Sequence, residues 1–349
     1  MSAFFKLEGI SMSDLYVLEV LGENTEGEEI SFSYCGIQDG LTYIQPFIQN
    51  QLLDSNITVK RRYIIQTFEL TTYLAENKDD LIVISTNKEQ VYKHFPEDCF
   101  IMPFRIHQIV DTSKGIEKVL SSMSKREVKR HSKQKEKYKL DFYTTNEDKH
   151  FFDFYNRMHK PTMKSRYDGL ARSVEINKAY EEIFKKGLLF IITENGVPVS
   201  GSVSQIDEEN KVLNARLIGV LNGDDRYRYI GAQNHVYHSI LEWACRDHRI
   251  DQVDFQGCEP FLTKGTFQYK KRFATEAILP PNHLNDKRLL VKANFNKQGI
   301  KDFLFNNPVM LVDKDDKLGV GYFYDVREPR LDIPYHSPGF LFERMIRME

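Results

Sequence analysis

Cysteine is scarce in this sequence, and neither sign of charge is in excess. The 349 residues include four cysteines, at positions 35, 99, 245 and 258. No two of them form a C-x-x-C motif or lie near paired histidines, so we expect no disulfide framework and a reducing compartment. The 48 Lys and Arg against 50 Asp and Glu give a formal net charge of −2, which excludes a protein that is basic throughout.

Long apolar runs and several common enzyme motifs are also missing. The N-terminal residues MSAFFKLEGISMSDLY lack a basic start followed by an apolar run of signal-peptide length, and the longest apolar stretches have the length of a strand. There is no Gly-x-Ser-x-Gly, no P-loop and no Rossmann glycine run. The sequence therefore predicts a cytoplasmic protein without a membrane span, whose chemistry comes from other motifs.

The length and the local patterns predict two folded parts and a tail. A chain of this length allows about two domains. We expect a small N-terminal module at 1–112, in which the apolar run LIVIS at 81–85 is a strand covered on both faces. The main domain is expected at 113–290, and residues 291–349 are expected to form an extension that packs on the body.

A basic segment stands near the start of the expected main domain. Ser124 and Glu127 have the spacing of a capping box, which predicts that a helix begins there. Between residues 125 and 139 there are eight Lys or Arg and two Glu. Such a helix is either a solvated face or a surface for a polyanion, namely RNA or the phosphates of a nucleotide cofactor.

The segment after the basic helix shows helices and strands in a fixed order. Apolar stripes predict a first helix that ends before Pro161, and Asn195-Gly196 between two apolar runs predicts a hairpin. The predicted elements are helices at 150–159 and 174–186, strands at 188–194, 197–207 and 211–221, a helix at 232–248 and a strand at 252–257. Because the last strand is entered from a helix, it is expected to lie parallel to its neighbour.

This order is that of the GNAT acyltransferase fold, and three stretches resemble its Fem-related (FemAB-like) branch. They are FYNRMHKPTMKSRYDGLA, GVLNGDDRYRYIGAQNHVYHSILEWA and VDFQGCEPFLTKGTFQYKKRFA, between about residues 150 and 275. The basic helix also resembles the Arg- and Lys-rich helix before the second module of Fem-type peptidyltransferases. The resemblance implies an α+β fold with a mixed, mostly antiparallel sheet flanked by helices, in a tandem arrangement whose first GNAT-like module is reduced.

The resemblance also implies where a cofactor binds. In GNAT proteins the third strand splays from the next one, and the pantetheine arm of acyl-CoA, such as acetyl-CoA, lies in the gap. The pyrophosphate meets the start of the following helix, where free N–H groups favour anions. The matching strand residues are Leu217, Gly219 and Val220, and the matching helix-start residues are Arg228, Gly231 and Ala232. Gln233 stands where the branch has a small residue, which keeps aminoacyl-tRNA open as the donor.

Acyl transfer to an amine needs a group that removes a proton and donors that stabilise the oxyanion. Asp254 and Glu259 lie at or just past the end of the last strand and are the candidate bases, with capping or loop carboxylates as the alternative. Backbone N–H groups around 217–220 are the candidate oxyanion donors. Lys270 matches a lysine that lies at the active cleft of Fem-type enzymes, and an exposed strand lysine is the alternative.

The same comparison assigns substrate contacts to Arg166, Tyr167 and Tyr269. Arg166, near Gly169, is a plausible anchor for a carboxylate or phosphate because arginine makes bidentate contacts, with a surface salt bridge as the alternative. His235-x-x-His238 lacks a third ligand at a suitable spacing, so no metal is expected.

Three functions remain open from the sequence. The first is transfer of an acyl group from acyl-CoA to an amine of a sugar, amino acid or peptide precursor, in cell-wall or surface-polysaccharide assembly. The second keeps the fold and takes the acyl group from aminoacyl-tRNA, with tRNA as partner. The third is a non-catalytic binding protein on the same fold.

Overall fold

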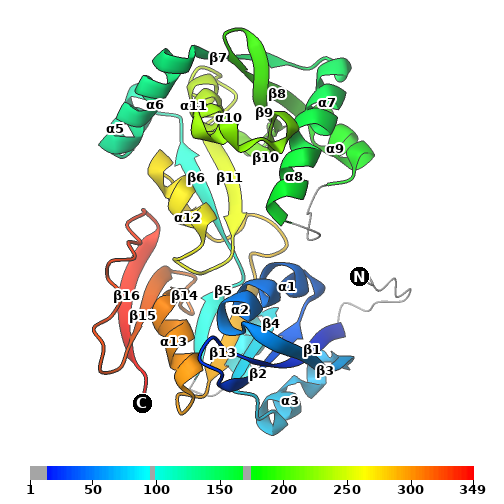
Figure 1. The fold of residues 1–349 in the computed structure, drawn as a ribbon, viewed down its shortest axis with the longest axis vertical. Coiled ribbons are helices and arrows are strands. Elements are labelled where there is room, and N and C mark those ends of the chain that lie inside the picture. The colour runs from blue at the N-terminus through cyan, green and yellow to red at the C-terminus, as the bar shows by residue number, and fades with distance from the viewer. Residues whose placement is uncertain (1–13, 95–98, 168–173) are drawn as a thin grey trace. The chain divides into compact units, whose positions relative to one another are not determined.

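The computed structural model describes residues 14–94, 99–167 and 174–349. The chain divides into two compact units (Figure 1). Unit 1 consists of residues 1–106, 258–267 and 277–349, and unit 2 consists of residues 107–257 and 268–276. This division differs from the expected boundaries at 112 and 290, because the segment expected to form a C-terminal extension is part of unit 1.

Unit 1 contains a six-stranded sheet of order β3-β1-β2-β4-β13-β5 and a three-stranded sheet of order β14-β15-β16. Its strands are β1 (Asp14–Glu23), β2 (Glu29–Gly36), β3 (Ser55–Gln66), β4 (Leu81–Asn87), β5 (Phe100–Pro103), β13 (Lys287–Ala293), β14 (Val309–Val312), β15 (Leu318–Tyr324) and β16 (Phe340–Arg347). Its helices are α1 (Gln38–Tyr43), α2 (Gln45–Leu52), η1 (Thr67–Glu69), α3 (Leu70–Glu76), α4 (Lys88–His94) and α13 (Gln298–Asn306). Because β13 pairs antiparallel with both β4 and β5, the late segment supplies an interior strand to a sheet begun by the N-terminal residues.

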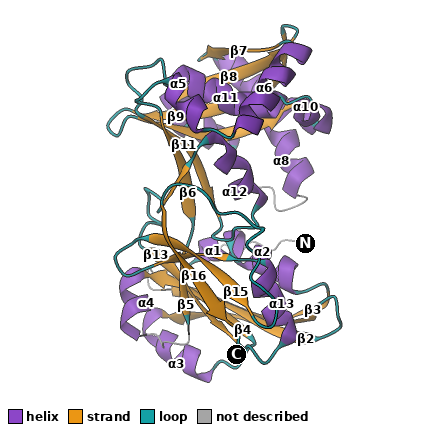
Figure 2. Cartoon of the chain, turned by 90° about the vertical axis from the view of Figure 1, so that its left-hand side faces the viewer, coloured by secondary structure: helices purple, strands orange, loops and turns teal. Residues whose placement is uncertain are grey.

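Unit 2 is built on a seven-stranded sheet of order β12-β6-β11-β10-β9-β8-β7, with strands in orange in Figure 2. The strands are β6 (Ile106–Asp111), β7 (Leu140–Thr145), β8 (Gly187–Glu194), β9 (Val197–Asp207), β10 (Val212–Val220), β11 (Gln252–Cys258) and β12 (Glu276–Ile278). The longer helices are α5 (Ile116–Ser122), α6 (Lys125–Tyr138), α7 (Asp148–Phe154), α8 (Lys160–Tyr167), α9 (Ile176–Glu182), α11 (Ala232–Ala244) and α12 (Gly265–Lys270). Short helical turns are η2 (Tyr155–His159), η3 (Phe184–Lys186), η4 (Leu221–Gly223), α10 (Asp225–Tyr229) and η5 (Lys271–Phe273).

The apolar run of β8 explains why helices cover both faces of this sheet. Leu188, Phe190 and Ile192 are buried in the cluster that contains the apolar side chains of α11. The alternate residues Leu189 and Ile191 are buried in a second cluster with the side chains of α7 and α9. A strand that is apolar at every position needs cover on both faces, since successive side chains point in opposite directions.

The order of elements expected for unit 2 is confirmed. β8, β9 and β10 pair antiparallel, α11 follows, and β11 pairs parallel with β10. Asn195 and Gly196 form the hairpin turn with φ of 51° and 82°, in the left-handed region that such turns require. The fold is α+β and GNAT-like, and the two main sheets agree with the tandem arrangement.

The prediction that the first helix ends before Pro161 is wrong. The π-helical turn η2 joins α7 to α8, and Pro161 is the second residue of α8. A proline is tolerated in the first turn of a helix, where its missing N–H costs little. Among the described residues, no helix combines the length and the apolar character that a bilayer span requires.

Candidate functional site

Strands β10 and β11 begin as neighbours and then part. Their parallel pairing covers only three positions and ends with Asn214 opposite Asp254. β10 continues to Val220 and β11 continues to Cys258 without further pairing between them. The expected splay is therefore present, and Asn214 and Asp254 mark its apex.

A local turn explains why β11 leaves β10. Asp254 Oδ1 accepts the backbone N–H of Gln256 at 2.6 Å, and Gln256 has a left-handed φ of 65°. Beyond the apex, Gln256 Nε2 donates to Asn214 Oδ1 at 3.2 Å. The Lys270 ammonium donates to the Gln256 carbonyl at 2.9 Å and so stabilises the kinked backbone of β11.

Asp254 also pairs with a histidine that comes from a distant part of the sequence. His107 Nδ1 lies 2.6 Å from Asp254 Oδ2, and both side chains are buried. His107 is on β6, which lies next to β11 in the sheet. The carboxylate that marks the apex is therefore in direct contact with an imidazole from the strand on the other side of β11, which is an arrangement suited to proton transfer.

The edge of β10 beyond the apex is taken by side chains of the helices before it. His159 Nδ1 contacts the Ile218 carbonyl at 3.0 Å. Thr162 Oγ1 accepts the Val220 N–H at 2.9 Å and contacts the Val220 carbonyl at 3.2 Å. The Val220 N–H, expected as an oxyanion donor, is thus already hydrogen-bonded.

Gly219 allows this close approach. A Cβ built on Gly219 would lie 2.5 Å from His159 N and 2.5 Å from Met158 C, both of which are backbone atoms. Backbone cannot move aside as a flexible side chain can, so any larger residue at this position must push η2 away from the sheet.

Substitution Gly219→Ala is expected to lower the free energy of unfolding by about 3 kcal/mol, the order of an overpacked core site. Urea unfolding followed by the fluorescence of Trp243, the one tryptophan of the sequence, measures it. Gly265→Ala is the matched control, because a Cβ at Gly265 meets nothing within 4 Å. Equal stabilities of the two variants would contradict the tight packing at Gly219.

The start of α11, where the resemblance places a pyrophosphate, is covered. Gly231 has φ 89° and caps the helix, and a Cβ there would lie 2.4 Å from Gln134 Oε1. Gln134, on α6, also donates to the Tyr229 carbonyl at 3.1 Å. Ala232 is fully buried. Arg228 pairs with Asp225 on its own short helix and contacts Ser165 Oγ at 3.4 Å.

A buried polar network joins α6 to α11. Glu127 accepts hydrogen bonds from Arg130 at 2.6 Å and Asn234 at 2.7 Å, and lies 3.3 Å from His238 Nε2. Burial alone would raise the pKa of Glu127, but these hydrogen bonds outweigh it and lower the pKa to about 2. Tyr269, expected to contact substrate, donates to Asn234 Oδ1 at 2.8 Å and so belongs to this network.

Three histidines complete the network. His131 stacks on His238 with ring centroids 3.6 Å apart, and His131 Nε2 lies 2.6 Å from His235 Nδ1. Burial, together with the neighbouring imidazoles, lowers the pKa of His131 to about 2, and burial and Lys135 lower that of His235 to about 3. In the described part of the chain, no group of three or more His, Cys, Asp or Glu side chains is arranged to hold a metal ion.

The remaining candidate residues lie apart from the apex or outside the described part. Glu259 falls in unit 1, where its carboxylate lies 3.2 Å from the Lys264 ammonium, so Asp254 is the candidate base within unit 2. Lys270 is not an exposed strand residue but ends helix α12 and is buried. Arg166 and Tyr167 are the last two residues of α8, and the structure describes their backbone but not their side chains. Gly169 lies outside the described residues.

Sequence reasoning missed three residues of this region. His107 and Thr162 carry no motif, because their partners are far away along the chain. Arg216 lies just beyond Asn214, where the register between β10 and β9 shifts, and its side chain is exposed. The available signal was that His107 and Gln108 are polar residues next to each other inside a short strand with apolar residues on either side of them.

Comparison with known proteins gives structural likenesses only. No protein-family model matches this sequence, and no curated protein matches it. The crystal structure of FemX has a TM-score of 0.42 and 10% identity over 78% of this chain and 88% of that chain. The structure of L-PGS from Bacillus licheniformis has a TM-score of 0.37 and 8% identity over 79% of this chain and 84% of that chain. A GCN5-related N-acetyltransferase-like protein from Streptococcus suis has a TM-score of 0.30 and 10% identity over 79% of this chain and 83% of that chain. With three antiparallel strands, a helix and a diverging parallel strand in its own unit 2, the chain has a GNAT-like fold.

Proposed function

We propose that this chain is an N-acyltransferase that moves an acyl group onto an amine at the apex between β10 and β11. The observation that carries the proposal is the end of pairing at Asn214 and Asp254, with the buried carboxylate of Asp254 at that point. An amine must lose a proton to form an amide, and a carboxylate–imidazole pair at the apex supplies an acceptor. Arg216, exposed just beyond the apex, offers a cation for an anionic part of a substrate.

The donor that these contacts favour is an aminoacyl ester of tRNA. An acyl-CoA bound as in GNAT proteins would pair with the edge of β10 and place its pyrophosphate at the start of α11. His159 and Thr162 already contact the edge of β10, and Gln134 covers the start of α11. A tRNA donor needs neither position, because its phosphates can bind elsewhere on the surface.

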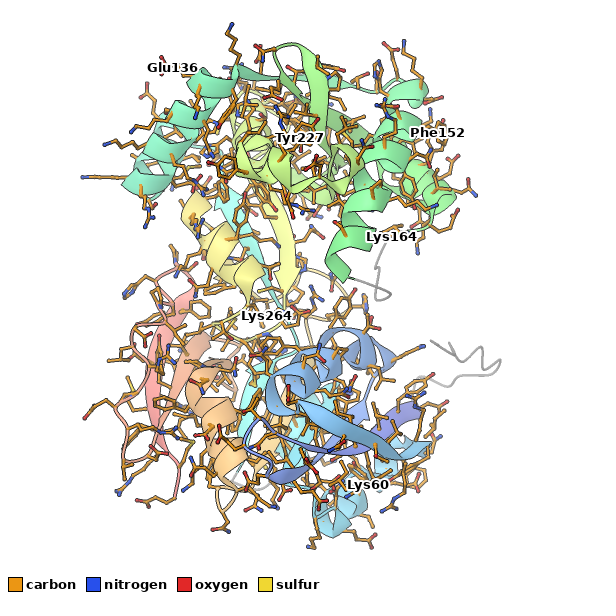
Figure 3. All side chains as sticks on the ribbon, in the orientation of Figure 1. Lys60, Glu136, Phe152, Lys164, Tyr227 and Lys264 are labelled. Carbon is orange, nitrogen blue, oxygen red and sulfur yellow. The ribbon has the colours of Figure 1, made fainter. Side chains whose placement is uncertain are left out.

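The basic face of α6 is the surface that fits such a donor. Lys125, Lys129 and Lys133 are exposed and follow one another at four-residue spacing, so they form a row with a rise of about 6 Å between neighbours. None of the three forms an ion pair with a described residue. Figure 3 shows the side chains of this helix, with Glu136 labelled, projecting from its outer side.

An exposed aromatic side chain lies close to α6. Tyr229 is 80% exposed, and Gln134 of α6 holds its carbonyl. Aromatic rings next to lysines are a common combination for single-stranded nucleic acid, because bases stack on the ring while the cations meet phosphates. Both the row and Tyr229 are therefore features that suit the single-stranded acceptor end of a tRNA.

Charge reversal of the row tests the donor. The variant Lys125→Glu/Lys129→Glu/Lys133→Glu is expected to bind unfractionated tRNA at least about tenfold more weakly, with the slope of log K against log salt smaller by about 2 to 3. Fluorescence anisotropy with labelled tRNA measures both. The control variant is Lys60→Glu/Arg62→Glu/Lys314→Glu. It changes the net charge by the same amount, on exposed residues of unit 1, and should leave tRNA binding unchanged.

Activity is tested with tRNA charged with radioactive amino acids and a mixture of amino sugars, amino acids and peptides. Appearance of label in an amide product supports the proposal. If acetyl-CoA or CoA instead raises the melting temperature and tRNA does not bind, the donor is acyl-CoA. No transfer from either donor would contradict the enzymatic assignment and leave a binding protein.

A further inference from the structure

We infer that His107 Nε2 is the proton acceptor of the transfer reaction and that Asp254 positions the His107 ring. The inference rests on the proposed function for its chemistry and on the contact between His107 Nδ1 and Asp254 Oδ2 for its geometry. His107 is the catalytic residue in this assignment, and Asp254 acts through it.

The hydrogen bonds around Asp254 fix the tautomer of the imidazole. Asp254 Oδ1 accepts an N–H from the backbone of Gln256, and in this assignment Oδ2 is an acceptor as well. Asp254 Oδ2 lies 2.6 Å from His107 Nδ1, and an acceptor carboxylate there requires the proton on Nδ1. In the neutral ring the lone pair is then on Nε2.

The second ring nitrogen of His107 is open to an incoming group. No described residue hydrogen-bonds Nε2 of His107. Nε2 of His159 and Nε2 of His235 are also without a hydrogen-bond partner, but those two atoms are fully buried and Nε2 of His107 is not. Nε2 of His107 therefore reaches solvent, although the residue as a whole is only 6% exposed.

The burial of Asp254 strengthens its hold on His107. The Asp254 side chain is buried, with 1% of the residue exposed. A buried carboxylate is expensive without partners, so the Gln256 N–H and the imidazole are both needed to stabilise it. Lys270 is a charged group close to this turn, and it is hydrogen-bonded to the Gln256 carbonyl.

The step balances with the amine and the acyl ester or thioester alone. The amine nitrogen forms a bond to the acyl carbon while His107 Nε2 takes one proton from that nitrogen. The bond from the acyl carbon to the leaving oxygen or sulfur then breaks, and the imidazolium gives its proton to that atom. Asp254 stays ionised throughout and stabilises the transient imidazolium.

Carbethoxylation by diethyl pyrocarbonate tests the open Nε2 without any substrate. In the folded full-length protein, peptide mapping by mass spectrometry should find His107 modified at least tenfold faster than His159, whose Nε2 is buried. The exposed His248 supplies the upper reference. Asp254→Asn, whose amide would donate to Nδ1 and move the ring proton to Nε2, should slow modification of His107 with the fold retained by circular dichroism.

Turnover tests the role in catalysis. His107→Gln keeps a donor for Asp254 but has no titratable lone pair, so kcat should fall about 10²- to 10⁴-fold while KM stays within about threefold. If His107 is as unreactive as His159, or if His107→Gln keeps its kcat in an active protein, the inference is overturned. If the wild-type protein transfers no acyl group, the proposed function fails, and the reactivity of His107 alone decides whether its Nε2 is available.

Discussion

Acidification from pH 7.5 to pH 5 is expected to lower the free energy of unfolding by about 2 kcal/mol for each of His131 and His235. Both imidazoles are held neutral in the fold, with pKa values of about 2 and about 3. In the unfolded chain their pKa is about 6.5. Urea unfolding at several pH values, followed by the fluorescence of Trp243 on α11, measures the loss.

The sign follows from which state binds more protons. Between pH 6.5 and pH 3 the unfolded chain protonates both histidines and the folded chain does not, so stability falls as the pH falls. The geometry shows why the fold resists protonation: His131 Nε2 and His235 Nδ1 share one hydrogen bond at 2.6 Å, and a second proton would set two N–H groups against each other. Lys135 of α6 adds positive charge near both histidines, which Glu127 only partly offsets at His131 and Asp141 only partly offsets at His235.

Variants separate these histidines from other acid-sensitive groups. His131→Gln should flatten the dependence of stability on pH between 6.5 and 5, whatever its stability at pH 7.5. His248→Gln, which removes an exposed histidine of the same unit, should leave the dependence unchanged. A wild-type protein whose stability does not change between pH 7.5 and pH 5 would contradict the buried neutral pair.

Substitution Glu127→Ala is expected to lower the free energy of unfolding by about 3 to 5 kcal/mol. Arg130, Asn234 and His238 all direct hydrogen-bonding atoms at this buried carboxylate. Removing it leaves a cation and an amide without their acceptor between two packed helices. Urea unfolding at pH 7.5 measures the change, and Glu127→Gln should lie between the wild type and the alanine variant because its amide oxygen still accepts.

Glu136→Ala is the matched control for this substitution. Glu136 lies on the same helix, is exposed and is labelled in Figure 3. Its removal should change stability by no more than about 0.5 kcal/mol, as is usual at exposed positions. If Glu127→Ala and Glu136→Ala are equally stable, the network between α6 and α11 does not stabilise the fold.

The N-terminus of α6 illustrates how far a local pattern reaches. The capping-box spacing correctly placed the start of the helix, and Ser124 Oγ accepts the Glu127 N–H at 3.1 Å. In a complete capping box the glutamate side chain bonds back to the cap, but the Glu127 carboxylate is directed at α11 instead. The cap depends on neighbouring residues, whereas the fate of a long side chain depends on what packs against the helix.

The C-terminal residues show what local patterns do not predict. Its strand near 318–324 and its helix near 300–304 were predictable from their apolar patterns. Its membership of unit 1 was not, because β13 is joined to β4 by pairing across some two hundred residues, and no local pattern encodes the partner of a strand.

The sequence by itself determined the order of elements in unit 2, the hairpin at Asn195-Gly196 and the basic face of α6, whereas the splay after β10 was expected only from the resemblance to GNAT proteins. The first three features follow from periodicity and turn chemistry, which act over a few residues. Only the tertiary structure brought His107 to Asp254 across 147 residues and placed Thr162 and Gln134 over the expected cofactor positions. The order of strands in a sheet is decided by the packing of the whole unit, and contacts between distant side chains exist only after that order is set.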